Sequence, residues 1–140
     1  MVDLAGYTRM DGEGTHSLKV VEGIGYDGCV LQLGEAVEAS VNPEDPRCPH
    51  VEYALPDMAA DSVTVHVYTL PFFPIYKGKG TRFGISVDGY PVQGAQNLPK
   101  EFSKVWKDQV LRNGAVATFR FPIDAKRRRH KLAVYVAIRV

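Results

Sequence analysis

The sequence has few of the features that usually identify a protein's chemistry. Among its 140 residues are two cysteines, Cys29 and Cys48, and one tryptophan, Trp106. Its 17 basic and 16 acidic residues leave a formal net charge of +1, so no overall field attracts nucleic acid or a membrane surface. No apolar run has the length of a membrane span, and the first residues do not resemble a signal peptide. We therefore expect a protein that binds neither nucleic acid nor membranes.

The histidines and cysteines are too scattered to predict a metal site. The four histidines stand singly in the sequence: His16, His50, His66 and His130. No two of them have the spacing of zinc ligands, so we expect no metal and no cofactor. Cys29 lies in the apolar run 29–33, where a buried free thiol is the simpler interpretation, and a disulfide with Cys48 stays open. We expect His66 to face solvent or the second layer, and His130 to hydrogen-bond backbone groups in a turn.

The acidic and hydroxyl residues do not have the spacing of a catalytic site. The acidic residues beside expected strands and turns include Glu52, Asp57, Asp61 and Asp88. Glycoside hydrolysis needs two carboxylates across a cleft, but the sequence does not place any two of these within reach of each other. Ser62 and Ser86 lie in expected strands, without the strand-to-helix elbow that exposes a nucleophilic hydroxyl. Solvated or turn-capping side chains are the simpler interpretation.

Short stretches of alternating apolar and polar residues recur along the chain, as in half-buried β-strands. They are residues 16–21, 29–33, 50–55, 62–70, 82–90, 115–123 and 130–140. Connections rich in proline and glycine separate them. Residues 99–114 have apolar side chains at helical spacing, with Asn113-Gly114 as a stop signal, which predicts a short helix and leaves an irregular extended run as a close alternative. The sequence predicts one all-β domain over residues 1–140, an antiparallel β-sandwich or jelly roll with at most one short helix.

The rest of the chain is organised around residues 62–90, which contain two of these stretches. We expect both to be strands of one sheet. The loop between them is bounded by prolines and glycines and carries Phe72, Phe73 and Tyr76. Aromatic side chains on a loop need a cover, which is a ligand, a neighbouring domain or the sandwich itself. These three residues are therefore candidates for binding a sugar ring.

A run of four basic residues, Lys126 to Arg129, lies between the last two expected strands. A solvated hairpin tip is the simpler interpretation. A guanidinium also pairs well with a carboxylate, so Arg127 and Arg128 are candidates for binding an acidic sugar.

Several segments resemble the C-terminal β-sandwich region of glycoside hydrolase family 115, the xylan α-1,2-glucuronidases. They are GIGYDG (23–28), PHVEYAL (49–55), VYTLPFFPIYKGKGTRFGISVDGYP (67–91), WKDQVLRN (106–113) and RHKLAVY (129–135). The central segment is the most specific of them. The resemblance implies an accessory module behind a catalytic barrel that removes glucuronic or methylglucuronic acid from xylan. The family's catalytic residues lie in earlier domains, and none of them maps onto this chain.

Three hypotheses about function follow from the residues and the resemblance. The first is a noncatalytic accessory domain, a fragment of a larger enzyme, that braces the catalytic domain, forms a homo-oligomer interface or lends a loop to a neighbouring active site. The second is a carbohydrate-binding module that holds xylan oligosaccharides through Phe72, Phe73 and Tyr76, with Arg127 or Arg128 pairing a uronate. The third is a small stand-alone hydrolase that uses two carboxylates which the sequence alone does not identify as a pair. The resemblance implies a periplasmic or extracellular location, whereas the sequence alone also leaves a cytoplasmic protein open.

Overall fold

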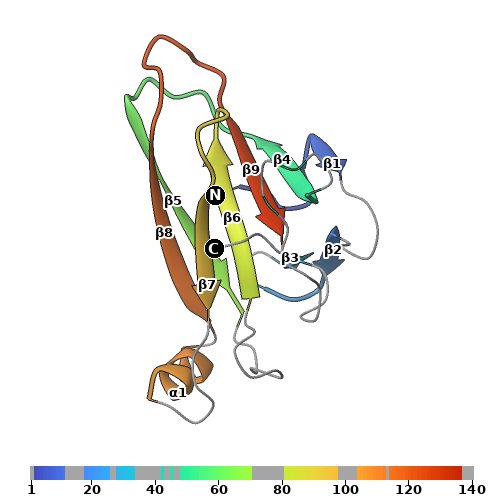
Figure 1. The fold of residues 1–140 in the computed structure, drawn as a ribbon. Helices are drawn as coiled ribbons and strands as arrows, with labels where there is room; N and C mark the ends of the chain where they lie inside the picture. Colours follow the sequence, from blue (N-terminus) through green and yellow to red (C-terminus); the bar gives the residue numbers. More distant parts are fainter. Residues whose placement is uncertain are drawn as a thin grey trace.

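The computed structural model describes residues 2–11, 18–25, 28–33, 42, 45, 48–70, 81–97, 104–112 and 114–136 (Figure 1). The elements, in chain order, are β1 (Arg9–Asp11), β2 (Leu18–Glu22), β3 (Cys29–Leu33), β4 (His50–Ala54), β5 (Ser62–Thr69), β6 (Thr81–Val87), β7 (Gln93–Asn97), α1 (Lys104–Leu111), β8 (Ala115–Pro122) and β9 (Lys131–Val136).

The strands form three antiparallel sheets. The largest has the order β1-β4-β9-β6-β7, and the other two are the pairs β2-β3 and β5-β8. In Figure 1 the pair β5-β8 forms a second layer behind the large sheet, and α1 projects below both layers. The predicted fold class, an antiparallel β-sandwich with at most one short helix, is confirmed by this arrangement.

The core lies between the large sheet and the pair β5-β8. Side chains that alternate along the strands meet there, since successive residues of a strand point to opposite faces. The most buried core residues are Val51, Tyr53, Phe83, Ile85, Val87, Phe119, Phe121, Ile123, Leu132 and Val134. Along β8 the alternation is complete, because Phe119 and Phe121 are buried while Val116, Thr118 and Arg120 are exposed. The period of two that predicted these strands therefore also gives their buried face.

The expectation that both strands of residues 62–90 belong to one sheet is wrong. β5 pairs with β8, from Ser62 opposite Pro122 to Thr69 opposite Ala115. β6 instead lies inside the large sheet, between β9 and β7. The alternation in each strand indicates a buried face but not a partner, and residues 71–80 are too long a connection to impose hairpin pairing.

The link between β8 and β9 also joins the two layers, so the predicted hairpin tip at Lys126–Arg129 is not the tip of a hairpin. β8 pairs with β5, whereas β9 pairs with β4 and β6. β7 was not predicted, because its sequence QGAQN has no apolar alternation. It is nevertheless paired with β6 at the edge of the large sheet, where few apolar side chains are required.

The strand registers give the domain two distinct ends. We call the end with the turn after β6, the 55–61 segment and the 123–130 segment the turn end. There, Leu55 N donates to His130 O (2.9 Å) and Ile123 N donates to Asp61 O (2.9 Å). We call the opposite end, with α1, Thr69 and Ala115, the helix end. The two ends are separated by the length of an eight-residue strand such as β5, roughly 25 Å.

Candidate functional site

The turn end is organised by the tight turn after β6. Asp88 and Gly89 both have positive φ, at 52° and 76°, and Tyr90 N donates to Val87 O (3.0 Å). Positive φ at both central residues is characteristic of a type I′ turn, whose twist matches that of the flanking strands. Glycine and aspartate tolerate this conformation better than most residues, which explains the Asp-Gly pair in this position.

Asp88 connects this turn to the beginning of β9. Its Oδ2 lies 2.5 Å from His130 Nδ1, and its Oδ1 accepts a hydrogen bond from Lys131 N at 2.8 Å. Its own backbone N donates to Lys131 O at 2.9 Å. The side chains of His130 and Asp88 are 0% and 5% exposed. We call this buried pair the Asp88–His130 clamp, because it joins two segments that are far apart in the sequence.

The electrostatics of the clamp favour an ionised carboxylate. Burial alone raises the pKa of Asp88, but the hydrogen bonds from His130 and Lys131 N, together with the charge of nearby Arg127, hold that pKa below its ordinary value. A carboxylate can only accept, so His130 Nδ1 is the donor. The prediction that His130 hydrogen-bonds backbone groups is wrong for its side chain. The buried ring bonds the carboxylate of Asp88, which is 42 positions away in the sequence.

An Asp–His pair occurs in many catalytic sites, but here its geometry is that of a structural element. The Nε2 of His130 is buried and has no hydrogen-bond partner among the described residues. Ser86, two residues before Asp88, has a hydroxyl, but its Oγ donates to Tyr90 O at 2.5 Å and not to the imidazole. A nucleophilic serine would have to bond the histidine and face a substrate. The clamp therefore orders the turn end rather than activating a nucleophile.

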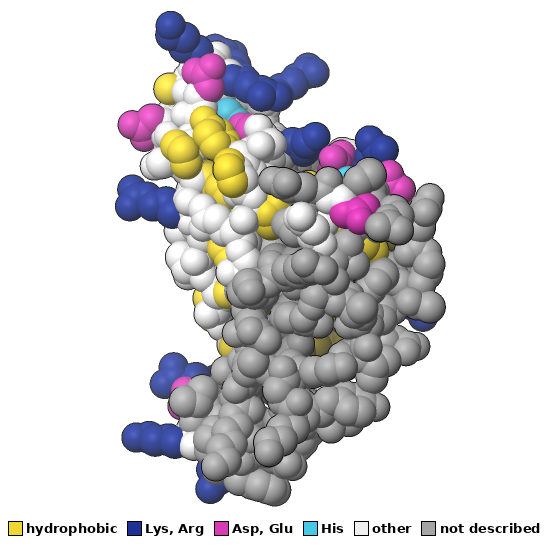
Figure 2. All heavy atoms as spheres, viewed as in Figure 1, with side chains coloured by type: hydrophobic (Ala, Val, Ile, Leu, Met, Phe, Trp, Pro, Cys, Tyr) yellow, Lys and Arg dark blue, Asp and Glu magenta, His cyan; other side chains and the backbone are white. Residues whose placement is uncertain are grey.

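The run of basic residues lies on the surface beside the clamp. Lys126, Arg127, Arg128 and Arg129 are all exposed, and none forms an ion pair with another described residue. The backbone at the start of the run is held by Asp124, whose Oδ1 accepts from Lys126 N at 2.9 Å. We call Lys126–Arg129 the basic segment. Figure 2 shows basic side chains around the upper end of the molecule, next to a group of hydrophobic side chains.

The predicted sugar-binding residues fall into two groups. Arg127 and Arg128 lie at the turn end, on the basic segment. The candidates Phe72, Phe73 and Tyr76 lie outside the described residues, so their part of the prediction stays a prediction.

The chain enters and leaves the aromatic loop at the other end of the domain. The flanking residues Thr69 and Thr81, where β5 ends and β6 begins, lie at the helix end. The described residues that flank this loop therefore lie at the opposite end of the domain from Arg127 and Arg128. Tyr90, a residue that is 39% exposed at the same end as the arginines, was not predicted from the sequence.

A second polar cluster lies on the face of the large sheet that points away from the core. Glu52 Oε1 is 3.3 Å from Lys131 Nζ and 3.7 Å from His50 Nε2. The His50 ring stacks on Tyr135 with its centroid 5.1 Å away. Burial, reinforced by the charge of Glu52, raises the pKa of Tyr135. Glu52 thus pairs with the ammonium group of Lys131 and lies beside His50, and the cluster joins β4 to β9.

The other acidic candidates do not form a carboxylate pair with Glu52. Asp88 bonds His130, while Asp57 and Asp61 are exposed. The two candidate carboxylates that are not exposed, Asp88 and Glu52, are thus each held by basic partners.

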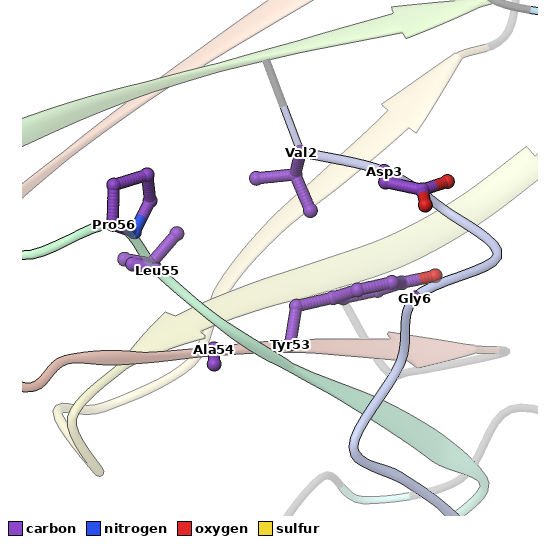
Figure 3. A pocket seen from close by; sticks show the side chains of 7 residues that line it. All are labelled: Val2, Asp3, Gly6, Tyr53, Ala54, Leu55 and Pro56. Atoms are coloured by element: carbon purple, nitrogen blue, oxygen red, sulfur yellow. The ribbon is translucent and has the colours of Figure 1, made fainter.

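A shallow pocket of about 310 Å³ lies between the N-terminal segment and the end of β4 (Figure 3). Its wall contains Tyr53, whose hydroxyl donates to Leu4 O at 2.9 Å, and its rim carries Asp3. Burial, followed by the nearby Cys29, Asp3 and Tyr7, raises the pKa of Tyr53 to about 12. A hydroxyl that is protonated and already bonded does not act as a base at neutral pH, so the pocket has no evident chemistry.

The described residues hold no group of three or more potential metal ligands. Cys29 and Cys48 do not form a disulfide with each other, and Cys29 is half-buried, whereas a buried thiol was the simpler interpretation. Burial, with a contribution from Asp45, raises the pKa of the Cys48 thiol to about 11, so it is a poor nucleophile. Within the part of the chain that the structure describes, no helix has the length and apolarity to span a membrane.

The helix end carries most of the large apolar side chains that the structure leaves exposed. Leu111 and Val110 of α1 are 86% and 42% exposed. Tyr68 and Val116, which face each other across β5 and β8, are 56% and 57% exposed. Four of the seven large apolar residues that are exposed in the described part of the chain therefore lie at this end.

Comparison with known families identifies the chain. The model of the glycosyl hydrolase family 115 C-terminal domain matches residues 2–138. The chain belongs to this family. The resemblance inferred from the five sequence segments is therefore confirmed. A comparison with curated proteins gave no match.

A solved structure shows the same fold as this family 115 domain. It is BtGH115A, described as a family GH115 4-O-methyl-α-glucuronidase with specificity for decorated arabinogalactans. The TM-score is 0.65 at 21% identity, and the match covers 94% of this chain but 16% of that one. At this identity the likeness supports the fold alone, and the chain spans about one sixth of the neighbour's length.

Proposed function

We propose that this domain is a noncatalytic accessory module of a family 115 type α-glucuronidase and that it braces the catalytic domain. Family membership supports the assignment to such an enzyme. The match to 16% of BtGH115A supports a larger parent that contains other domains. In the described residues, the polar clusters at the turn end and on the large sheet serve to join strands, which favours a structural role over a catalytic one.

The observation that carries the proposal is the exposed apolar surface of the helix end. Leu111, Val110, Tyr68 and Val116 define this surface, and α1 projects beyond the sheets to present part of it (Figure 1). Burying one such side chain against another surface contributes about 1.5–3 kcal/mol relative to leaving it in water. The rest of the parent enzyme is the partner that this surface fits best, because it is held next to the domain in the same polypeptide.

The test measures binding between this 140-residue chain and the catalytic part of the enzyme that carries it, produced as a separate polypeptide. We expect saturable binding, and we expect Leu111→Glu to weaken it about tenfold or more because a charge replaces a buried apolar contact. Lys126→Glu at the turn end is the matched control and should leave binding unchanged. Absence of binding, or equal weakening by both variants, would contradict the proposal.

The alternative that the helix end joins two copies of the domain makes a different prediction. It requires the isolated chain to self-associate in sedimentation equilibrium, and Leu111→Glu to restore the monomer. Isologous contacts of this kind pair the same patch on both subunits.

A second candidate function is binding of a uronate-bearing glycan. Arg127 and Arg128 favour it, because both are exposed and form no ion pair with the described residues. An unpaired guanidinium is a good partner for a carboxylate. As predicted from the sequence, this candidate also uses Phe72, Phe73 and Tyr76. Phe73→Ala tests the aromatic contribution, because it should reduce xylo-oligosaccharide binding while the protein stays folded.

A further inference from the structure

The turn end presents an aromatic ring from a backbone that is fixed on both sides. Tyr90 N donates to Val87 O at 3.0 Å, and Tyr90 O accepts from Ser86 Oγ at 2.5 Å. Tyr90 is 39% exposed. An exposed aromatic side chain can stack on a flat ligand such as a sugar ring.

The basic segment beside this turn is also held in place. Lys126 N and Arg127 N donate to Asp124 Oδ1 and Asp124 O, at 2.9 and 3.1 Å. At the other end of the segment, His130 is fixed by Asp88 through its ring and by Leu55 N through its carbonyl. These hydrogen bonds fix the backbone at both ends of the segment, and its four basic side chains are exposed.

The Asp88–His130 clamp joins the two parts. Asp88 directly precedes Gly89 and Tyr90 in the turn, and its carboxylate bonds His130 at the end of the basic segment. The charge of Arg127, an exposed residue of the basic segment, also lowers the pKa of the same carboxylate. Figure 2 shows basic, acidic and hydrophobic side chains next to one another at this end.

We propose that the turn end binds a carboxylate-bearing sugar of an acidic polysaccharide, with Tyr90 stacking on the sugar ring and Arg127 and Arg128 pairing the carboxylate. The proposal rests on the glycan-binding candidate function above and moves its aromatic contact from the 71–80 loop to Tyr90. Planar guanidinium groups pair carboxylates with two parallel hydrogen bonds. The formal net charge of +1 for the whole chain provides no extended field of the kind that a nucleic acid needs.

The experiment titrates the 140-residue chain with two oligosaccharides that have the same xylose backbone, one carrying a single 4-O-methylglucuronic acid and one undecorated. Binding is followed by NMR shifts of the backbone amides. We expect saturable shifts at Gly89, Tyr90 and Arg127 with the acidic probe, and binding at least about tenfold weaker with the neutral probe. Added salt should weaken the acidic interaction, because the arginines are exposed.

Variants locate the site. Tyr90→Ala, Arg127→Ala and Arg128→Ala should each raise the Kd for the acidic probe about fivefold, as expected for one exposed contact. Tyr7→Ala is the control for the aromatic change, and Arg112→Ala on α1 is the control for the charge change; both should leave the Kd unchanged. All five residues are exposed, so the variants are expected to fold.

Four results would overturn the proposal: no saturable binding of the acidic probe, equal binding of the neutral probe, binding that Tyr90→Ala leaves unchanged, and equally tight binding of a short DNA duplex. If Phe73→Ala abolishes binding while Tyr90→Ala does not, glycan binding survives but its site is the 71–80 loop. The bracing function does not depend on any of these outcomes, because Leu111→Glu at the opposite end tests it separately.

Discussion

Asp88 and His130 are 42 positions apart in the sequence, yet Oδ2 of one lies 2.5 Å from Nδ1 of the other in a site that excludes nearly all solvent. The contact joins the turn after β6 to the segment that crosses from one layer of the sandwich to the other. Neither residue lies in a regular strand. The clamp thus adds a side-chain contact to the backbone hydrogen bond between Asp88 N and Lys131 O that already joins the two segments.

Replacing the carboxylate of Asp88 should make the free energy of unfolding less dependent on pH. Asp88→Asn keeps a residue that tolerates positive φ but removes the charge, and we expect it to lower the free energy of unfolding at pH 7 by about 1–3 kcal/mol. The folded-state pKa of Asp88 is lowered, so its contribution is fully present above the unfolded pKa of about 3.9 and is lost as pH falls through the folded value. Urea unfolding of both proteins from pH 7 to pH 3 measures the difference.

The difference between the two proteins should therefore shrink below about pH 4. Asp124→Asn provides a control for removing an acidic residue at the same end, because Asp124 is exposed and its oxygen can still accept from Lys126 N. A difference between wild type and Asp88→Asn that is constant over the whole pH range would show that the carboxylate charge does not stabilise the fold.

Truncating a side chain on the core-facing side of a strand should lower the free energy of unfolding more than truncating one on the solvent-facing side. Ile85 of β6 is 1% exposed, so Ile85→Ala leaves a cavity and should lower the free energy of unfolding by about 2–5 kcal/mol. Val116→Ala changes a residue that is 57% exposed and should cost less than about 0.5 kcal/mol. Thermal or urea unfolding of the two variants measures both values, and equal losses would contradict the assignment of faces.

Much of the local structure could be predicted from the sequence because it depends on local pattern. Alternation identified β8 and its buried face, and the helical spacing before Asn113-Gly114 identified α1 (Lys104–Leu111). His66 was expected to face solvent or the second layer, and its exposed ring bonds Thr118 across β5 and β8 at 3.0 Å. These features need no information about distant residues.

Sheet membership and the candidate site could not be predicted in the same way. β5 and β6 follow each other in sequence but lie in different sheets, because pairing is decided by contacts with β8 and β9. The Asp88–His130 clamp joins residues that have no sequence signal in common. Tyr90 was overlooked because the fold, and not its neighbours in sequence, places it at the same end as Arg127 and Arg128.

The connection between α1 and β8 should tolerate no side chain at Gly114. A Cβ at this position would meet Thr69 O far closer than real Cβ atoms approach a carbonyl. That oxygen belongs to the backbone at the end of β5, so only a shift of the β5-β8 pair can relieve the contact. We expect Gly114→Ala to cost about 1–3 kcal/mol in urea unfolding.

Gly6→Ala is the control for this substitution, because the nearest atom to its new Cβ is the end of the Asp3 side chain at 3.3 Å. That side chain can move, and we expect a change below about 0.5 kcal/mol. If both alanine variants were equally stable, the close approach of Gly114 to β5 would not exist in solution.

The hydroxyl of Tyr53 should hold the N-terminal segment against the large sheet. Tyr53→Phe removes its hydrogen bond to Leu4 O while keeping the buried ring, so we expect a loss of about 1 kcal/mol. Gly6 N, which donates to Asp3 O at 3.1 Å in the same segment, should exchange its hydrogen faster in the variant than in the wild type. Tyr7→Phe changes an exposed ring and should leave exchange at Gly6 as it was. Unchanged exchange in Tyr53→Phe would mean that the segment is held by the apolar contacts of Val2 and Leu4 with the core, and not by the hydroxyl.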